Sequence, residues 1–221
     1  MCVIAISEKG KRQPSKKELE TMFNYNPDGA GFMVARNNRV IISKGYMIFS
    51  DYWRAIQAER FTDSDIVVYH CRISTQAGTG PEMTQPFPLN SDLRRMEYLD
   101  TSCSIGIAHN GIIPLTSNSR EKRFSDTALY IANYLTKIIR KPHDLNIPEI
   151  SEIISGTIGH SKLAILTANG AIHTIGKFTE HNGILLSNLN HLQPETIYKT
   201  QCKYAAYDSL FDRLEAERKI I

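Results

Sequence analysis

The strand-forming segments of this sequence come in pairs joined by short turns. The clearest pair covers residues 162–168 and 171–175, which are joined by the turn dipeptide Asn169-Gly170, and another pair is joined at Asn37-Asn38. Strands joined this tightly run antiparallel, because parallel neighbours need a crossover connection of about a dozen residues or more. The expected strands cover residues 3–6, 30–36, 40–44, 66–70, 104–109, 162–168, 171–175 and 183–187.

Helical patterns lie in separate blocks between these strands. Ser15 and Glu18 have the spacing of a capping box, which predicts a short helix after them. Ser50 and Ser125 can each cap a further helix. The later helices are expected over residues 51–61, 125 to about 140, 147–154 and 206–218. Helices in blocks between antiparallel strand pairs predict an α+β protein rather than a doubly wound parallel sheet.

The length and composition suit a single domain over residues 1–221. In a chain of 221 residues of which 42% are hydrophobic, a substantial core can form. The sequence has no apolar run near the roughly 18 residues of a membrane span, and no charged-then-apolar leader. We therefore expect a soluble, cytoplasmic protein with no membrane partner.

The four cysteines have no spacing that indicates a metal site. Cys2, Cys71, Cys103 and Cys202 include no C-x-x-C pair and no His/Cys spacing of the zinc type. Neither a disulfide framework nor a structural metal is therefore expected, and no cofactor is required.

The net charge of +3 and the pI near 8.6 make the chain mildly basic. Its one basic cluster, residues 9–12 with Lys16 and Lys17, is short and has no aromatic residues between the charges. This composition favours a solvated face over a nucleic-acid surface. Nucleic-acid binding through the cluster remains a weaker alternative, and it predicts a steep dependence of binding on salt.

Cys2 is placed where it can become the N-terminal residue. Removal of Met1 by an aminopeptidase would leave Cys2 with a thiol and a free α-amine on one residue, so that the mature chain would begin with a nucleophile and its own base. The reference pKa values, about 8 for the amine and 8.5 for the thiol, allow the amine to take the thiol proton near neutral pH. The alternative interpretation is a small buried packing residue.

Several short motifs follow Cys2 in an ordered series. They are Asp28-Gly29-Ala30-Gly31, His70-Cys71-Arg72-Ile73-Ser74-Thr75, Gln85-Pro86-Phe87, His109-Asn110-Gly111 and Ser125-Asp126-Thr127. In order and approximate spacing the series resembles the glutaminase domain of class II glutamine amidotransferases, which are N-terminal-nucleophile hydrolases. This resemblance implies a four-layer αββα sandwich with mainly antiparallel sheets. It also implies release of ammonia from glutamine through a γ-glutamyl thioester on Cys2.

The resemblance assigns roles to five further residues. Asn110, through its side-chain NH₂, and Gly111, through its backbone N–H, would stabilise the oxyanion that forms when Cys2 attacks. Arg72 can bind the α-carboxylate of the substrate with its fork of donors, helped by the Thr75 hydroxyl. Asp126 would bind the α-ammonium group.

Structural alternatives exist for several of these residues. Asn110-Gly111 is also typical of a type I′ hairpin turn, and Asp126 stands where a helix N-cap is expected. His70 and His109 could form a Cys-His dyad with Cys2, but the resemblance favours a structural role for both. Asp28 and Gly31 match a turn of the family near the nucleophile and are expected to shape that loop.

The chain departs from the family pattern at three places. Tyr25-Asn26-Pro27-Asp28 replaces the common Arg-Gly-x-Asp, Cys71 replaces a threonine or serine, and Gln76-Ala77-Gly78 is one residue longer than the common Thr-His-Gly. These differences affect the contacts expected for the substrate carboxylate. They suggest a divergent, stand-alone branch.

The motifs end near Thr127, and the remaining residues are expected to complete the sandwich rather than to form an acceptor domain. The ammonia would then pass to a separate synthase subunit, or the enzyme would simply hydrolyse glutamine or another γ-glutamyl amide. The segment over residues 75–101 is hypothesised to be a lid or docking surface. A catalytically silent relative that acts as a binding or regulatory module is the alternative from another class, since a retained Met1 would block the amine.

Overall fold

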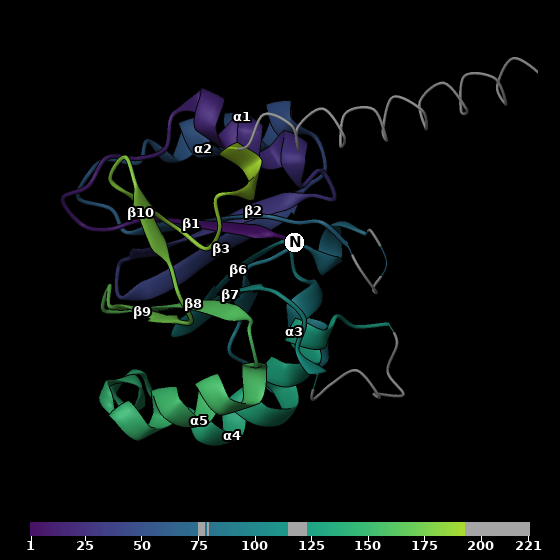
Figure 1. The fold of residues 1–221 in the computed structure, drawn as a ribbon, viewed down its shortest axis with the longest axis vertical. Helices are drawn as coiled ribbons and strands as arrows, with labels where there is room; N and C mark the ends of the chain where they lie inside the picture. Colours follow the sequence, from purple (N-terminus) through teal and green to yellow (C-terminus); the bar gives the residue numbers. More distant parts are fainter. Residues whose placement is uncertain (75–77, 79, 115–122, 193–221) are drawn as a thin grey trace, which may run out of the picture.

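The computed structural model describes residues 1–74, 78, 80–114 and 123–192, whose strands form two antiparallel sheets (Figure 1). The strands are β1 (Val3–Ser7), β2 (Ala30–Arg36), β3 (Arg39–Tyr46), β4 (Val67–Cys71), β5 (Phe87–Pro88), β6 (Asp100–Cys103), β7 (Ile105–Asn110), β8 (Lys162–Thr167), β9 (Ile172–Ile175), β10 (Thr179–His181) and β11 (Ile184–Leu186). The larger sheet has the order β10-β11-β1-β4-β2-β3-β6, and the smaller sheet the order β5-β7-β8-β9. Because β1 lies between β11 and β4, the start of the chain is held inside the larger sheet.

Helices pack on one face of each sheet (Figure 1). The α-helices are α1 (Lys16–Tyr25), α2 (Phe49–Glu59), α3 (Asp126–Tyr130), α4 (Thr136–Ile138) and α5 (Pro148–Ile158). Short 3₁₀ helices cover Pro81–Met83, Leu93–Glu97, Pro142–Asn146 and Asn190–Leu192. α1 and α2 pack on the larger sheet, whereas α3 and α5 pack on the smaller one.

Three hydrophobic clusters hold these elements together. One lies between α1, α2 and the larger sheet, and another lies between the smaller sheet and the helices α3 and α5. The remaining cluster joins the two sheets, where Ile4 and Ile6 of β1 pack with Ala164 of β8. Val3 and Ala5 belong instead to the cluster beside α1, because successive side chains of a strand point to opposite faces.

The predicted α+β architecture with antiparallel strands is confirmed. β8 and β9 form the hairpin that the turn at Asn169-Gly170 predicts. The capping box of α1 is also confirmed, because the Glu18 backbone N–H donates to the Ser15 hydroxyl at 3.3 Å and the Ser15 N–H donates to the Glu18 carboxylate at 2.8 Å.

Three predicted helices were wrong in detail. α2 begins at Phe49, so Ser50 lies within the helix instead of capping it, and the left-handed backbone of Arg60 (φ 52°) ends it. The helix predicted from residue 125 to about 140 is interrupted, because Ile131–Leu135 form a π-helical turn between α3 and α4. α5 runs four residues further than predicted, and its Ile158 packs in the core beside the smaller sheet.

The segment over residues 71–101 contains more regular structure than the sequence predicted. It includes β5, the first residues of β6 and two 3₁₀ helices. These pieces have two to five residues, which is too short for a periodic pattern to be recognised. β10 was missed for the same reason, and the helix predicted over residues 206–218 lies outside the described residues. No helix in the described part of the chain is both long enough and apolar enough to cross a membrane.

Gly31 is required where β2 passes the loop before β5. A Cβ atom at this position would meet the Gln85 carbonyl oxygen and would come within 2.9 Å of the Lys44 Cα. We therefore expect Gly31→Ala to lower the free energy of unfolding by about 1–3 kcal/mol, because both neighbours are backbone atoms that cannot move cheaply. Urea denaturation measures this change.

Gly156→Ala is the matched control for this substitution. Gly156 is exposed in α5 with no atom close to a new Cβ, so the alanine should raise helix stability by roughly 0.5–1 kcal/mol. Equal effects of the two substitutions would contradict the packing argument at Gly31.

Candidate active site

Cys2 and Arg72 lie next to each other on the same face of the larger sheet. The register Val3↔Cys71 and Ile4↔His70 between β1 and β4, continued by one residue, pairs Cys2 with Arg72. Arg72 still takes part in the ladder with β2, because its N–H donates to the Gly29 carbonyl at 2.8 Å. The alternation that turns Ile4 toward the smaller sheet turns Cys2 the same way. Cross-strand partners of this kind have Cβ atoms about 5 Å apart.

Asn110 approaches this place from the smaller sheet. It is the last residue of β7, and it lies on the same face of the strand as Ala108, which packs between the sheets. Its Nδ2 lies 2.8 Å from the Ser187 Oγ, and the same oxygen accepts the Ile4 backbone N–H at 2.9 Å. One serine thus joins the strand that follows Cys2 to the predicted oxyanion residue.

Ser187 and Asn188 were not predicted to be part of the site. β1 and β11 pair through Ala5↔Leu186. The two residues after Leu186 contact the start of the chain through their side chains. Asn188 donates to the Cys2 carbonyl at 2.8 Å, while Ser187 binds both backbone groups of Ile4. Two consecutive polar residues at the end of a buried strand are the sequence signal that could have indicated them.

The Cys2 thiol is half-buried and protonated in its ground state. Its Sγ donates to the Ile73 carbonyl at 3.6 Å. Burial raises the pKa of the thiol, and the positive charges of the N-terminus and Arg72 act in the opposite direction. A base beside the sulfur would be needed to form the thiolate, which is the role that the sequence assigns to the α-amine.

Arg72 is buried, yet its guanidinium is only partly engaged. Its Nη2 donates to the Ser74 hydroxyl at 3.2 Å and to the Gly78 carbonyl at 2.9 Å, whereas its Nη1 has no partner in the described part of the chain. Burial lowers the pKa of Arg72, and the charges of Cys2, Asp28 and Asp126 act against this. These groups are therefore close enough to interact with one guanidinium.

Asp126 is the first residue of α3 and connects it to the loop after β7. Its carboxylate accepts the backbone N–H groups of Ile113 and Thr127, at 2.8 and 2.7 Å. The helix cap is Ser125, whose hydroxyl accepts the Ala128 N–H at 3.2 Å. Ser125 thus fills the capping role that was the alternative for Asp126. The Thr127 hydroxyl also donates to the Asp126 carboxylate, at 3.3 Å, so Asp126 ties the start of α3 to the loop after β7.

Asn110-Gly111 is not a hairpin turn, so that alternative was wrong. The strand paired with β7 is β8, which begins at Lys162, and α3 to α5 lie between them in the chain. Gly111 has a φ of 141°, and a Cβ there would meet the Ser161 hydroxyl and come within 2.9 Å of the Ser161 Cα. A glycine is therefore required beside Asn110 by both conformation and space.

His70 and His109 have structural contacts. The Nε2 of His70 donates to the His109 carbonyl at 3.0 Å, and the Nδ1 of His109 lies 2.8 Å from the Thr127 hydroxyl. Burial lowers the pKa of His70 to about 3 and that of His109 to about 4, so both rings are neutral at pH 7. Among the described residues no hydrogen bond joins either ring to Cys2. This geometry favours the structural interpretation over a Cys-His dyad.

Unpartnered polar atoms collect around this place. Six buried side-chain polar atoms of the described residues have no hydrogen-bond partner, and four of them belong to His70, Arg72, His109 and Asn110. Buried polar atoms in folded proteins are normally satisfied by protein or water. Their concentration on the motif residues indicates a place where water or a ligand completes the hydrogen bonding.

Lys44 of β3 binds the loop over residues 82–96 through hydrogen bonds. Its Nζ donates to the carbonyls of Glu82, Thr84 and Met96 at 2.5–2.9 Å and lies 4.1 Å from the centre of the Phe87 ring. Burial lowers the pKa of Lys44 to about 7, but three carbonyl acceptors and an aromatic face favour the ammonium form. We therefore assign Lys44 a structural role in shaping the loop beside the site.

Asp28 shapes the loop that follows β4 through hydrogen bonds to backbone groups, the structural role that was predicted for it. Its carboxylate accepts the Ser74 N–H at 2.7 Å, and its own N–H donates to the Arg72 carbonyl at 3.0 Å. These bonds fix the residues on either side of Ile73. Thr75, the predicted helper of Arg72, lies outside the described residues, as do 76, 77 and 79 of the hypothesised lid.

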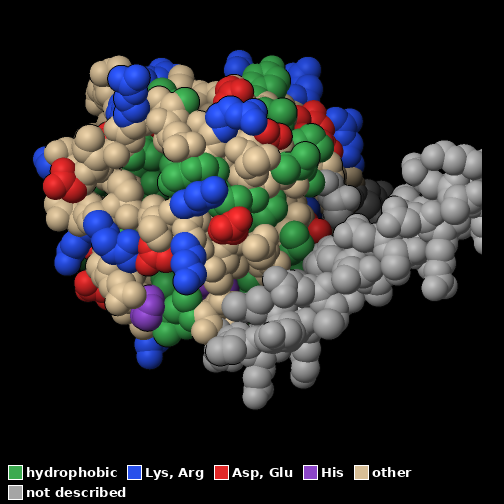
Figure 2. Space-filling model, turned by 90° about the horizontal axis from the view of Figure 1, so that it is seen from above, with side chains coloured by type: hydrophobic (Ala, Val, Ile, Leu, Met, Phe, Trp, Pro, Cys, Tyr) green, Lys and Arg blue, Asp and Glu red, His purple; other side chains and the backbone are tan. Residues whose placement is uncertain are grey.

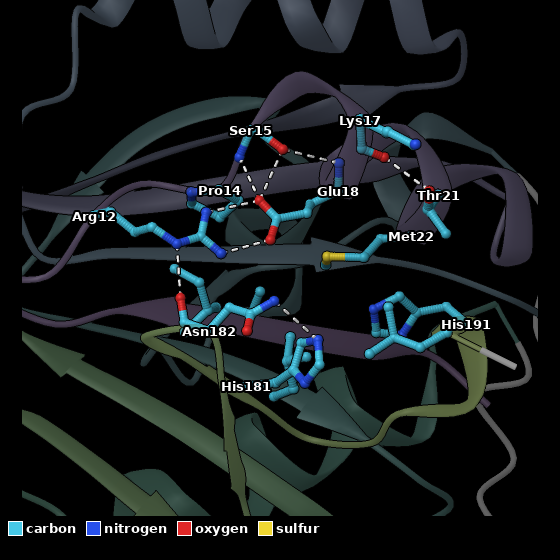
Figure 3. A pocket seen from close by; sticks show the side chains of 14 residues that line it. Arg12, Pro14, Ser15, Lys17, Glu18, Thr21, Met22, His181, Asn182 and His191 are labelled. Atoms are coloured by element: carbon cyan, nitrogen blue, oxygen red, sulfur yellow. Dashed lines mark hydrogen bonds and ion pairs between the residues drawn. The ribbon is translucent and has the colours of Figure 1, made fainter.

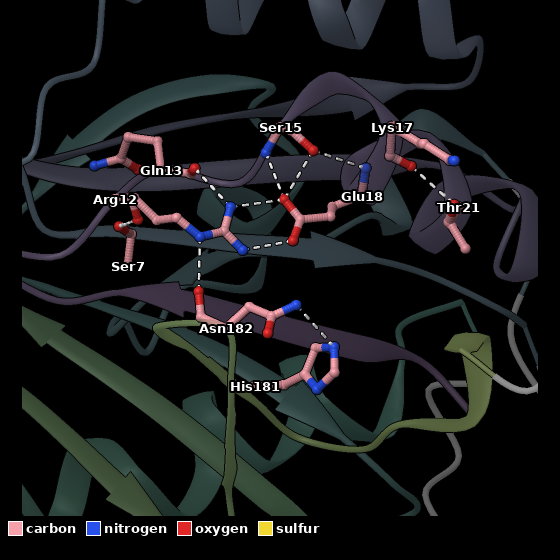
Figure 4. A network of polar contacts seen from close by, with 9 residues as sticks. All are labelled: Ser7, Arg12, Gln13, Ser15, Lys17, Glu18, Thr21, His181 and Asn182. Carbon is pink, nitrogen blue, oxygen red and sulfur yellow. Dashed lines mark hydrogen bonds and ion pairs between the residues drawn. The ribbon is translucent and has the colours of Figure 1, made fainter.

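A separate cavity of about 620 Å³ lies between α1 and the strands β10 and β11 (Figure 3). Its apolar wall includes Ala5 and Met22, and Ala5 faces away from the side of β1 that carries Cys2. Arg12 lies at its rim, with its guanidinium bound to Glu18 and to the Asn182 carbonyl (Figure 4). This network joins α1 to the β10–β11 turn, and the described residues that line the cavity include no cysteine.

The basic cluster of residues 9–17 is interspersed with acidic partners. Arg12 pairs with Glu18 at 2.5 Å, and Lys11 pairs with Glu180 at 3.5 Å. On the face seen in Figure 2, Lys and Arg side chains are scattered, and Asp and Glu lie between them. This pattern is typical of a solvated surface.

The described residues contain no group of three or more His, Cys, Asp or Glu side chains that could hold a metal ion. Comparison of the chain with known protein families and with curated proteins gives no match. The chemistry of the site therefore has to be inferred from its own residues.

Proposed function

We propose that this protein is an amidohydrolase of the class II glutamine amidotransferase type, which releases ammonia from glutamine or a related γ-glutamyl amide. The observation that carries the proposal is that Ser187 joins Asn110 to Ile4, two residues from Cys2, while the β1–β4 register places Arg72 opposite Cys2. The succession of helices, sheet, sheet and helices supports assignment to the four-layer αββα sandwich of N-terminal-nucleophile hydrolases.

The reaction would begin after Met1 is removed. The free amine of Cys2 takes the thiol proton, and the sulfur attacks the γ-amide carbon, so that a C–S bond forms and the carbonyl oxygen becomes an oxyanion. The ammonium group then protonates the leaving nitrogen as the C–N bond breaks, which leaves a γ-glutamyl thioester and ammonia. Water attacks the thioester, the amine takes a proton from that water, and glutamate leaves with the thiol restored.

The remaining residues would hold the substrate and its charge. Arg72 has an unpartnered Nη1 that can bind the α-carboxylate, and Asp126 can bind the α-ammonium group. Asn110 and Gly111 would supply the oxyanion donors. The ammonia would pass to a separate acceptor enzyme or into solution.

The decisive experiment combines mass and activity. Intact-mass measurement of purified protein should show loss of one methionine, and the processed protein should release equal amounts of ammonia and glutamate from glutamine or another γ-glutamyl amide. A processed protein that hydrolyses no member of a γ-glutamyl series would refute the proposal. Quantitative retention of Met1 would instead favour a binding or regulatory module.

Arg72→Lys is expected to raise KM about 10- to 100-fold with a much smaller change in kcat. A lysine keeps the charge but loses the two-pronged hydrogen bonding to a carboxylate, and a hydrogen bond to a charged group contributes roughly 1.5–3 kcal/mol. Steady-state kinetics on the γ-glutamyl substrate measures this change. Arg36→Lys is the matched control, because Arg36 ends β2 of the larger sheet and pairs with two carboxylates outside it, those of Glu59 and Asp65. An unchanged KM for Arg72→Lys would exclude it from carboxylate binding.

A further inference from the structure

The Ser187 hydroxyl is enclosed between the two sheets. Its Oγ lies 2.9 Å from the Ile4 backbone nitrogen and 2.8 Å from the Asn110 Nδ2. Ser187 is 1% exposed, and its own backbone is fixed because its N–H donates to the Ile4 carbonyl and its carbonyl accepts Lys162. Among the described residues the hydroxyl oxygen therefore has two nitrogen neighbours, one in β1 and one in β7.

The Ile4 N–H determines how the hydroxyl can bond. A backbone N–H can only donate, so the Ser187 oxygen accepts at that contact and keeps its own hydrogen for another partner. If the Asn110 Nδ2 faces Ser187, the Ser187 Oγ accepts two hydrogen bonds, and no described residue accepts the hydrogen of the hydroxyl. The buried Oδ1 of Asn110 then has no partner among the described residues either. Two mismatched groups would then lie side by side.

The opposite orientation of the amide removes this mismatch. The two ends of an asparagine amide have nearly the same shape, so the hydrogen-bond network decides which end faces which neighbour. With Oδ1 toward Ser187, the hydroxyl donates to Oδ1 and still accepts the Ile4 N–H. Nδ2 then turns to the side that has no protein partner, where it can donate to a developing negative charge.

We propose that Ser187 is a positioning residue that orients the Asn110 amide, with its Nδ2 toward the Cys2 thiol. The inference rests on the proposed function for its catalytic meaning, but the orientation itself can be measured without it. A continuous series runs from the Ile4 N–H through the Ser187 hydroxyl to the Asn110 amide. The first residue of the series, Ile4 of β1, is thus two residues from the nucleophile and also determines which end of the Asn110 amide faces Ser187.

The orientation can be read by NMR on protein with ¹⁵N-labelled asparagine. The Nδ2 protons of Asn110 should show nuclear Overhauser contacts to the β-protons of Cys2 and weaker ones to those of Ser187. Ser187→Ala should remove the preference. Nδ2 contacts to Ser187 without contacts to Cys2 would overturn the proposal, even if the wild-type protein proves to be an active amidohydrolase.

The kinetic test asks whether Ser187 acts through Asn110. Ser187→Ala should lower kcat about 10- to 100-fold with KM changed by less than about twofold, and Ser187→Thr should restore most of the rate because the hydroxyl is kept. In an Asn110→Ala background, Ser187→Ala should have no further effect. Equal losses in both backgrounds would show a merely structural role and overturn the proposal.

Ser7→Ala is the matched control. Ser7 is a buried serine at the other end of β1, where its hydroxyl donates to the Arg12 carbonyl at 2.5 Å. Its removal should leave kcat unchanged. If Ser187→Ala fails to fold, the NMR measurement on the wild-type protein still decides the orientation. If the wild-type protein has no activity, the proposed function fails, while the NMR result alone decides for or against the orienting role of Ser187.

Discussion

Cys2→Ala should abolish ammonia release while leaving the fold intact. Removing the nucleophile of a covalent hydrolase costs on the order of 10⁶-fold in kcat, because binding and oxyanion stabilisation alone cannot replace the bond-forming atom. Cys2 is half-buried immediately before β1, and alanine is only slightly smaller, so the free energy of unfolding should change little. Glutamate release with a coupled assay and urea denaturation check the two parts of this prediction.

The other described thiols provide the controls. Cys71 is fully buried in the cluster beside α1 and α2, on the face of the larger sheet opposite to Cys2, and Cys103 lies at the end of β6. Cys103→Ala should retain full activity, and Cys71→Ala should lose stability more than rate. A Cys2→Ala protein that still turns over γ-glutamyl amides would disprove the N-terminal nucleophile.

Asn110→Ala should lower kcat about 10²- to 10³-fold, with a smaller change in KM. Loss of one preorganised oxyanion donor costs roughly 2.7–4 kcal/mol of transition-state stabilisation, while the substrate is held mainly by its charged ends. The variant also frees the Ser187 hydroxyl from one partner, so a modest loss of stability is expected. Single-turnover kinetics separates the chemical step from substrate binding.

Asn146→Ala serves as the control for a general effect of removing an asparagine. Asn146 is exposed at the end of the 3₁₀ helix before α5, and its amide lies 3.5 Å from the His143 ring. Its rate should equal that of the wild type. A normal kcat in Asn110→Ala would remove Asn110 from the oxyanion site and leave only a structural role.

Local features of this fold could be predicted from the sequence because local interactions create them. The capping box of α1 is formed within four residues, and the β8–β9 hairpin is specified by one turn dipeptide and alternating residues. The broken helix after Ser125 was not predictable in the same way. Its apolar pattern fits a continuous helix, whereas Ile131–Leu135 form a π-helical turn whose Ile131 and Leu135 pack in the cluster beside the smaller sheet.

The candidate site was predictable in its motif residues but not in its supports. Ser187 binds Ile4 across 183 positions of the chain, and no local pattern indicates which distant strand end will close on the N-terminus. The role of Lys44 could not be predicted for the same reason. It lies near the end of an amphipathic strand, and the loop over residues 82–96, whose carbonyls accept its hydrogen bonds, buries it. Contacts made at long sequence separation depend on the register of both sheets.

The central position of β1 has a consequence for the order of events during synthesis. β1 pairs with β4 on one side and with residues 185–186 of β11 on the other. The Asn188 side chain also donates a hydrogen bond to the Cys2 carbonyl. A ribosome that adds about 5–20 residues each second therefore leaves the first residues unenclosed for many seconds before their last neighbours emerge. An enzyme that trims nascent chains has that interval in which to reach Met1, so cleavage would precede closure of the sheet.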